Sequence, residues 1–250
     1  AFLGTPYKLG PLGEGKDGEF DRDPLYSFRQ VDCTTFVEQV MALALEPDLK
    51  KALSGTLQRI RYKDGGEDGR GGFAYSARNH FPETDWVPNN SKAGFIKDIT
   101  EQVAGARTKY AVKTISKKAW YAAKTFDDIQ GFANLSQAAK EAKLKTLQAL
   151  GKDLADEEAS VPYVPASALA EVLADIPSGT IANIVREPRS DKPVVITHQG
   201  LIIDLGGRKV LRHAAYGQQV EDTPLLEYFV RYATASWRVV GVNLNEVRGR

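Results

Sequence analysis

The chain contains a single cysteine, Cys33, in 250 residues. One thiol cannot form an internal disulfide or a cysteine-based zinc or iron–sulfur cage, so the fold depends on its hydrophobic core. A chain of this length with 42% hydrophobic residues can bury such a core without help. The lone thiol is then either a small buried hydrophobe or a candidate nucleophile.

The charge balance excludes partners that need a strong electrostatic field. The chain has 33 Lys and Arg against 32 Asp and Glu, a formal net charge of +1. A field of this size holds neither nucleic acid nor an anionic membrane surface. No apolar run approaches the roughly 18 residues of a spanning helix, and no signal peptide opens the sequence. We expect a soluble, processed monomer with no membrane-spanning segment.

The region around Cys33 predicts a buried helix after an irregular arm. Residues 1–31 carry many Gly and Pro residues, which break helix and strand periodicity. From Cys33 onward, apolar residues recur at spacings of one, three and four and stop before Pro47. Asp32 can cap this helix, because its carboxylate can accept the free N–H groups of the first turn. Cys33 is then the first helical residue.

The rest of the sequence predicts an α+β domain over residues 1–250. Strands are expected at residues 180–186, 194–204, 209–213 and 235–244, after a short helix that follows Pro165. Residues 91–165 are rich in Ala, Lys, Gln and Glu, which favours a helical insertion or subdomain. The glycine-rich residues 65–72 lack the Lys-Ser or Lys-Thr of a phosphate loop, so we interpret them as a flexible connection.

A cysteine at a helix N-terminus has the chemistry of a nucleophile. Attack on an amide requires thiolate, and a free thiol with a pKa near 8.5 supplies little of it at neutral pH. The helix dipole and the unpaired N–H groups of the first turn favour the anion, and a nearby imidazolium favours it further. We therefore expect the pKa of the Cys33 thiol to be lowered.

A predicted hairpin brings two histidines together. The apolar segment 194–204 contains His198, and a second strand ends at His213. Gly206-Gly207 between them is a signal for a tight turn. This turn places Gly200 opposite His213, so the two histidines share one face about 7–8 Å apart at the backbone. One imidazole can then act as base while the other orients it. Alternatively, each histidine only satisfies its nitrogens at the sheet surface.

Several segments carry a resemblance to a known family. Leu3-Gly-Thr-Pro-Tyr7, Val31-Asp-Cys-Thr-Thr-Phe-Val-Glu38, Thr197-His-Gln-Gly200 and His213-Ala214 resemble the papain-like NlpC-type cell-wall hydrolases. Arg78-Asn-His-Phe81, Asp85-Trp86, Asn89-Asn90 and Asp98-Ile-Thr100 resemble the branch described as N-acetylmuramoyl-L-alanine amidase-like. The resemblance spans most of the chain, but residues from about 105 to 160 match no motif of that family.

The resemblance implies a papain-like α+β fold in which the Cys33 helix packs on an antiparallel sheet. It implies a cysteine amidase with Cys33 as nucleophile, His198 as base and His213 as the orienting residue. It also implies that Tyr7 reaches the cleft and that Asp32 sits in a substrate pocket. We expect no metal ion or cofactor.

A polar segment with one tryptophan is the candidate for substrate recognition. A muropeptide offers sugar hydroxyls, an acetamido group and carboxylates, which suit Asn and Asp side chains, a Trp face and an Arg fork. The segment supplies Arg78, Asp85, Trp86, Asn89 and Asn90. A solvated loop anchored by the tryptophan is the alternative. We interpret His80, in the same stretch, as a buried structural histidine.

The expected reaction is hydrolysis of the amide that joins the lactyl group of N-acetylmuramic acid to L-alanine, through a thioester on Cys33. The substrate would be peptidoglycan or muropeptide fragments, in the periplasm or outside the cell. A γ-D-glutamyl-diamino acid endopeptidase with the same triad stays open. A zinc amidase that uses His80, His198 and His213 also stays open, although no His-Glu-x-x-His pair supports it. A non-catalytic wall-binding module is a further alternative.

Overall fold

The structure, a computed structural model, describes residues 2–66 and 72–249. The α-helices are α1 (Cys33–Leu45), α2 (Leu49–Lys51), α3 (Leu57–Arg61), α4 (Val87–Lys92), α5 (Thr100–Ala104), α6 (Lys117–Ala122), α7 (Gln137–Ala149), α8 (Leu169–Val172) and α9 (Leu225–Tyr232). The strands are β1 (Ile96–Asp98), β2 (Lys109–Ile115), β3 (Glu157–Pro165), β4 (Thr180–Arg186), β5 (Ile196–Asp204), β6 (Lys209–Ala214), β7 (Val220–Pro224) and β8 (Val239–Val247).

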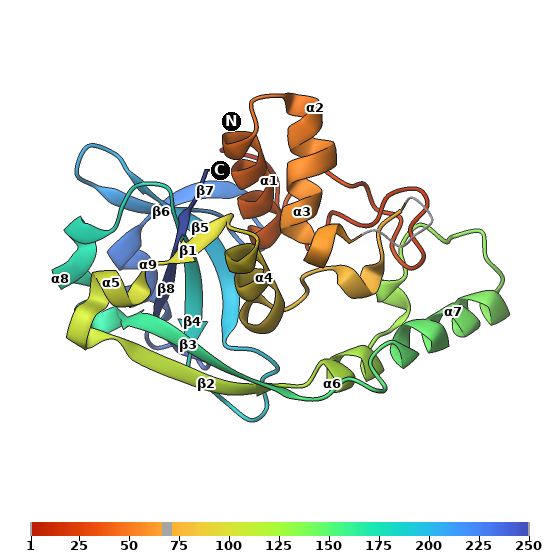
Figure 1. Ribbon diagram of the computed structural model, residues 1–250. Coiled ribbons are helices and arrows are strands. Elements are labelled where there is room, and N and C mark those ends of the chain that lie inside the picture. Colours follow the sequence, from red (N-terminus) through yellow and green to blue (C-terminus); the bar gives the residue numbers. More distant parts are fainter. Residues whose placement is uncertain (1, 67–71, 250) are drawn as a thin grey trace.

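An antiparallel sheet forms the centre of the fold. Its strands follow the order β2-β3-β8-β4-β5-β6-β7, and β1 pairs with β8 outside this path. Each of these strand pairs is antiparallel. Helices α1, α3 and α4 lie on one side of the sheet and α5, α8 and α9 on the other (Figure 1). The predicted α+β class with an antiparallel sheet is therefore confirmed.

Helix α1 begins and ends where the sequence predicted. The Asp32 carboxylate accepts the Thr35 backbone N–H at 2.8 Å, and the Thr35 hydroxyl accepts the Asp32 backbone N–H at 2.9 Å. This reciprocal capping box fixes Cys33 as the first helical residue. The apolar face of α1, which includes Phe36, packs in one cluster with Leu201 of β5. The helix thereby holds its N-terminus against the middle of the sheet.

Four strands lie at predicted positions, and the C-terminal region also contains elements that the sequence did not predict. Strands β4, β5, β6 and β8 match the predicted segments to within a few residues. Strand β7 went unpredicted because its five residues include Glu221, Asp222 and Pro224, types that are uncommon in strands. Helix α9 follows directly and packs its buried Tyr228 and Phe229 against the sheet.

Residues 91–165 were expected to form a helical insertion, and the structure corrects this interpretation. Strands β2 and β3 pair over seven residues, and the end of β3 continues onto β8. Helices α6 and α7 lie between these two strands in the chain and extend away from the sheet (Figure 1). The amino-acid composition of the segment favoured helices because only Ala111 and Ile115 of β2 are buried. With so few buried apolar positions, the composition averaged over the segment does not reveal the alternation of a strand.

Two further expectations concern loops and membrane spans. The predicted flexible connection at residues 65–72 falls mostly on residues 67–71, which lie outside the described part of the chain. Within the described residues, no helix is both long enough and apolar enough to cross a membrane.

The contact between β3 and β8 depends on a glycine, which gives a test of the fold. A Cβ added at Gly241 would lie 2.1 Å from the Val164 carbonyl oxygen, a backbone atom that cannot move aside cheaply. We expect Gly241→Ala to lower the free energy of unfolding by about 1–3 kcal/mol in urea titrations. Gly55→Ala is the matched control, because an added Cβ there has no atom within 4 Å. Equal stability of the two variants would contradict this β3–β8 packing.

Candidate active site

Strands β5 and β6 bring His198 and His213 into direct contact. The hairpin pairs Leu201 with Arg212, which is the predicted register. His198 Nε2 lies 2.8 Å from His213 Nδ1, so the expectation that both rings share one face is confirmed. Gly200 permits this approach, since a Cβ there would lie 2.9 Å from the Arg212 carbonyl oxygen and 3.0 Å from His213 Cβ.

A cavity of about 620 Å³ opens at the N-terminus of α1, and Cys33, His198 and His213 all line it. Aromatic and charged side chains make up much of the remaining wall. These are Tyr7, Tyr216, Tyr228, Tyr232 and Trp237, the cations Arg186, Lys192 and Arg231, and the acid Glu221. The thiol and both imidazoles therefore face one solvent-connected space of the size that small-molecule sites have.

The hydrogen bonds around the histidines assign their protons. His213 Nε2 lies 3.2 Å from the Thr223 hydroxyl, and that hydroxyl donates to Glu221 at 3.5 Å. A hydroxyl that donates to Glu221 accepts from His213, so His213 carries its proton on Nε2. Its Nδ1 then accepts from His198 Nε2–H. This assignment leaves His198 Nδ1 unprotonated and able to accept a proton.

Both histidines are neutral in the free protein. Burial, together with His213 and Arg186, lowers the pKa of His198 from 6.5 to about 3. Burial and Arg231 lower the pKa of His213 to about 4, against a smaller opposing effect of Asp222. A neutral His198 can serve as a base over most of the physiological pH range.

The Cys33 thiol is also neutral, which corrects the expectation of a lowered pKa. Burial and the neighbouring Asp32 carboxylate raise the pKa of Cys33 to about 11. Hydrogen bonds from the Gln199 backbone and from Thr34 oppose this rise without reversing it. The capping carboxylate that begins the helix thus offsets the favourable helix dipole. The resting site holds a neutral thiol and neutral imidazoles in one cavity, and a thiolate forms only if the thiol proton moves.

Tyr7 and Asp32, the two residues placed by the resemblance, have different positions. Tyr7 lines the cavity and packs edge-on against Tyr216 with ring centroids 5.2 Å apart. Asp32 is buried, and its oxygens accept from Thr35 and from the Gly10 backbone at 3.0 Å. Asp32 therefore caps α1 and anchors the N-terminal arm.

Arg78 and Asp85 were expected to bind substrate but form buried or half-buried ion pairs instead. The Arg78 guanidinium bonds Glu14 and lies 3.1 Å from Asp21. The Asp85 carboxylate lies 2.6 Å from Lys117 Nζ. Each charge is already paired within the protein, and neither side chain lines the Cys33 cavity. These residues tie the arm and helix α6 to the body of the fold.

Trp86 and Asn90 are also internal. Trp86 is completely buried, and its indole N–H donates to Glu38 of α1 at 3.0 Å. Asn90 is 1% exposed and donates to the backbone oxygens of Ile60 and Trp86. Neither side chain can contact a sugar, so the expectation of a Trp face for the substrate is corrected. The bond from Trp86 to Glu38 instead joins two of the segments that carry the family resemblance.

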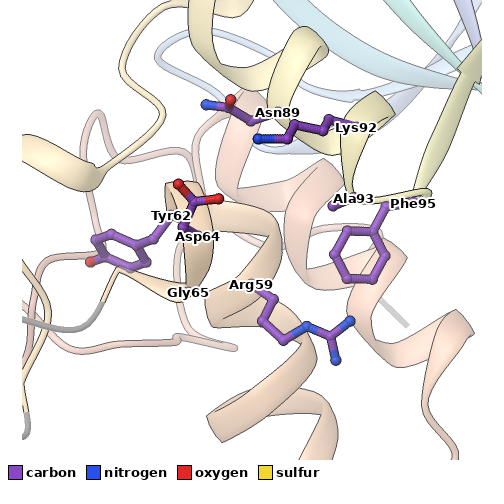
Figure 2. A pocket seen from close by; sticks show the side chains of 8 residues that line it. All are labelled: Arg59, Tyr62, Asp64, Gly65, Asn89, Lys92, Ala93 and Phe95. Carbon is purple, nitrogen blue, oxygen red and sulfur yellow. The ribbon is translucent and has the colours of Figure 1, made fainter.

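Asn89 lies at a second pocket, of about 310 Å³, away from Cys33. Figure 2 shows Asn89 and Lys92 of α4 on one side of this pocket and Arg59 of α3 on the other. Asn89 donates to Asn79 at 2.7 Å. The five predicted recognition residues of the segment are therefore not assembled around the histidine pair.

His80 lies in an aromatic cluster with Tyr75, Trp120 and Tyr121, and its Nε2 is 2.9 Å from the Tyr75 carbonyl oxygen. This is the structural role that the sequence predicted for His80. Over residues 2–66 and 72–249, no group of three or more His, Cys, Asp or Glu side chains is arranged to hold a metal ion. The zinc site that would combine His80 with the other two histidines is therefore not formed.

Sequence reasoning missed much of the cavity wall. Arg186, Tyr228 and Trp237 belong to no motif, and they reach the cavity from the end of β4, from α9 and from the turn before β8. One signal was available: Leu225, Tyr228, Phe229 and Tyr232 recur with helical spacing and predict an aromatic helix face. The two other positions depend on tertiary structure.

Comparison with solved structures places the chain among amidase-like α+β proteins. A structure from Legionella pneumophila str. Philadelphia 1, of the family model DUF1460, is 32% identical over 98% of this chain and 85% of its own, with a TM-score of 0.89. An N-acetylmuramoyl-L-alanine amidase from Bacteroides uniformis ATCC 8492 is 25% identical over 99% of this chain and 95% of its own, with a TM-score of 0.68. The search of curated proteins gave no match.

The family model described as AmiA-like, N-acetylmuramoyl-L-alanine amidase-like, matches residues 1–235. The chain belongs to this family.

The lowered pKa values of the histidine pair predict how stability depends on pH. In the unfolded chain each histidine binds a proton near pH 6.5, whereas in the folded protein it does so only near pH 3 or 4. The unfolded state thus binds more protons between these values, and stability falls as the pH decreases through this window. We expect a loss of about 1 kcal/mol or more per pH unit between pH 6 and pH 4.

Urea titrations at pH 7, 6 and 5 measure this dependence, and the double variant His198→Gln, His213→Gln is the control. Its slope should be shallower than that of the native protein, because the two titrating groups are absent. Parallel slopes would show that the two histidines are not held neutral by the fold.

Proposed function

We propose that this protein is a cysteine amidase of peptidoglycan, with a papain-like catalytic arrangement of the NlpC type. Cys33 is the nucleophile, His198 the base and His213 the residue that orients His198. One observation carries the proposal: Cys33, at the first turn of a capped helix, lines the same cavity as the hydrogen-bonded histidine pair. Membership of the amidase-like family supports amide hydrolysis as the reaction class.

The neutral resting pair defines the order of proton transfers. As Cys33 Sγ attacks the amide carbonyl carbon, its proton moves to His198 Nδ1, and His213 Nδ1 accepts from the imidazolium. His198 then protonates the amine as the C–N bond breaks, which leaves a thioester on Cys33. His198 next takes a proton from water as the hydroxide adds to the thioester carbonyl. The C–S bond breaks, the acid is released, and the proton returns to Cys33.

The bond we propose is the amide between the lactyl group of N-acetylmuramic acid and L-alanine. The family description and the name of the Bacteroides uniformis relative support this choice. The cavity also suits such a substrate, because its aromatic wall offers faces to a sugar and its cations offer partners to stem-peptide carboxylates. We therefore propose that the protein acts in the cell envelope.

Fragment masses test the bond and the nucleophile together. With a defined muropeptide, we expect N-acetylmuramic acid and the intact peptide as products, and no products from Cys33→Ala. Fragments cut between D-glutamate and the diamino acid would instead identify an endopeptidase. Activity of Cys33→Ala that EDTA abolishes would contradict the thiol mechanism and indicate a metal-dependent one.

The Thr223 hydroxyl provides a second test, because it fixes the tautomer of the pair through His213. Thr223→Val removes the acceptor for His213 Nε2–H and allows His213 to protonate Nδ1, which displaces the His198 proton toward Cys33. We expect kcat to fall about tenfold or more with little change in KM. Thr223→Ser keeps the hydroxyl and should retain most of the rate. Equal kcat values for Thr223→Val and the native protein would refute this role.

A further inference from the structure

Arg186 is a cation of the active-site cavity that forms no ion pair with any acid of the described residues. Its Nε donates to the Thr197 hydroxyl at 2.9 Å, and Nη1 donates to the Trp237 carbonyl oxygen. Its guanidinium carbon lies 5.3 Å from the Trp237 ring centroid and 5.8 Å from that of Tyr232. Across residues 2–66 and 72–249, no carboxylate forms an ion pair with Arg186. Two neutral oxygens and two rings thus hold a fixed, uncompensated charge.

Two carboxylates that follow Arg186 closely in the chain are paired elsewhere. Glu187 binds Arg238 at 2.7 Å, and Asp191 binds Arg189 at 2.9 Å. Among the described residues, the side-chain hydrogen bonds of Arg186 come from Nε and Nη1, which leaves the Nη2 donors for a ligand in the cavity that Arg186 lines. A guanidinium that is oriented in advance loses little side-chain entropy when it binds a carboxylate.

Irregularities in the sheet place Arg186 beside the histidine pair. The register of β4 shifts against β5 between Ile184 and Val185, and against β8 between Val185 and Arg186. Bulges of this kind redirect side chains at the end of a strand. Because Arg186 bonds Thr197, its guanidinium lies one residue along β5 from His198.

We propose that Arg186 binds a carboxylate of the leaving peptide, and that this group is the free α-carboxylate of the γ-linked D-glutamate. This inference rests on the proposed function. His198 must protonate the departing amine, so the leaving L-alanyl peptide lies on the His198 side of the cleft, where Arg186 is. The first carboxylate on that peptide belongs to the next residue, D-glutamate, about 4 Å of chain beyond L-alanine. Its γ-linkage leaves the α-carboxylate free.

Two substrates that differ in this group test the proposal with the native protein. One is N-acetylmuramoyl-L-alanyl-γ-D-glutamyl-L-lysine, and the other carries the α-carboxamide in place of the α-carboxylate. A charge-assisted bond predicts a kcat/KM about 10- to 100-fold higher for the acid. Equal kcat/KM values for the two substrates would overturn the proposal.

Variants assign the preference to Arg186. In Arg186→Gln the two substrates should be cleaved with similar kcat/KM, while Arg186→Lys should keep part of the preference for the acid. Arg238→Gln is the matched control, since Arg238 directly precedes β8, pairs with Glu187 and does not line the cavity. An undiminished preference in Arg186→Gln would assign the carboxylate to another cation and overturn the proposal.

Binding measurements separate this inference from the proposed function. Calorimetry with Cys33→Ala should give a Kd about 10- to 100-fold lower for the acid than for the amide, without any turnover. A preference in Kd with no cleavage of the muramoyl bond by the native protein would leave the carboxylate site standing and refute the reaction. Cleavage of both substrates with no preference in Kd or kcat/KM would refute the carboxylate site and leave the reaction standing.

Discussion

The packing of helix α1 against strand β5 holds the Cys33 thiol at the strand that carries His198. Phe36, Val37 and Met41 of α1 share one buried cluster with Leu201 of β5. The bond from Trp86 to Glu38 holds the same helix against the segment before α4. Together they fix the first turn of α1, and with it the Cys33 thiol, at the edge of the cavity. A helix shifted by one turn would move Cys33 by about 5.4 Å and separate it from His198.

A row of buried amides holds the sheet below this contact. Gln199 donates to Asn183 at 2.8 Å, Asn183 donates to Asn243 at 2.9 Å, and Asn245 also donates to Asn243. These bonds join β5, β4 and β8 across the centre of the sheet. Buried networks of this kind add rigidity because an unpaired amide in the interior is costly. The backbone of Gln199 also bonds the Cys33 thiol. The amide network therefore stabilises β5, the strand that carries His198 and contacts the nucleophile.

The sequence predicted those parts of the structure that local patterns encode. Capping chemistry and helical periodicity predict the Asp32 cap and the start of α1 at Cys33. The glycine turn predicts the register that pairs the two histidines. Trp86, Arg78 and Asp85 look like binding residues in the sequence because their types suit a muropeptide. Only the tertiary structure reveals that Glu38, Glu14 and Lys117 already satisfy them.

Arg186 illustrates the opposite case. It lies at the end of an apolar strand, and nothing local distinguishes it from a surface arginine. Its place in the cavity depends on two register shifts and on Trp237, about fifty residues later in the chain. The pKa of Cys33 was mispredicted for a related reason, since the effect of the helix dipole can be judged only against burial and the Asp32 carboxylate.

The central claim is that Cys33 carries the acyl group of the substrate during turnover. The most direct measurement is the mass of the protein in acid-quenched reactions with a muramoyl peptide, followed by peptide mapping. Our account predicts that the peptide containing Cys33 gains the N-acetylmuramoyl acyl group, and that Cys33→Ala gains nothing and releases no product. Turnover by Cys33→Ala at the native rate, with no mass added to either protein, would contradict it.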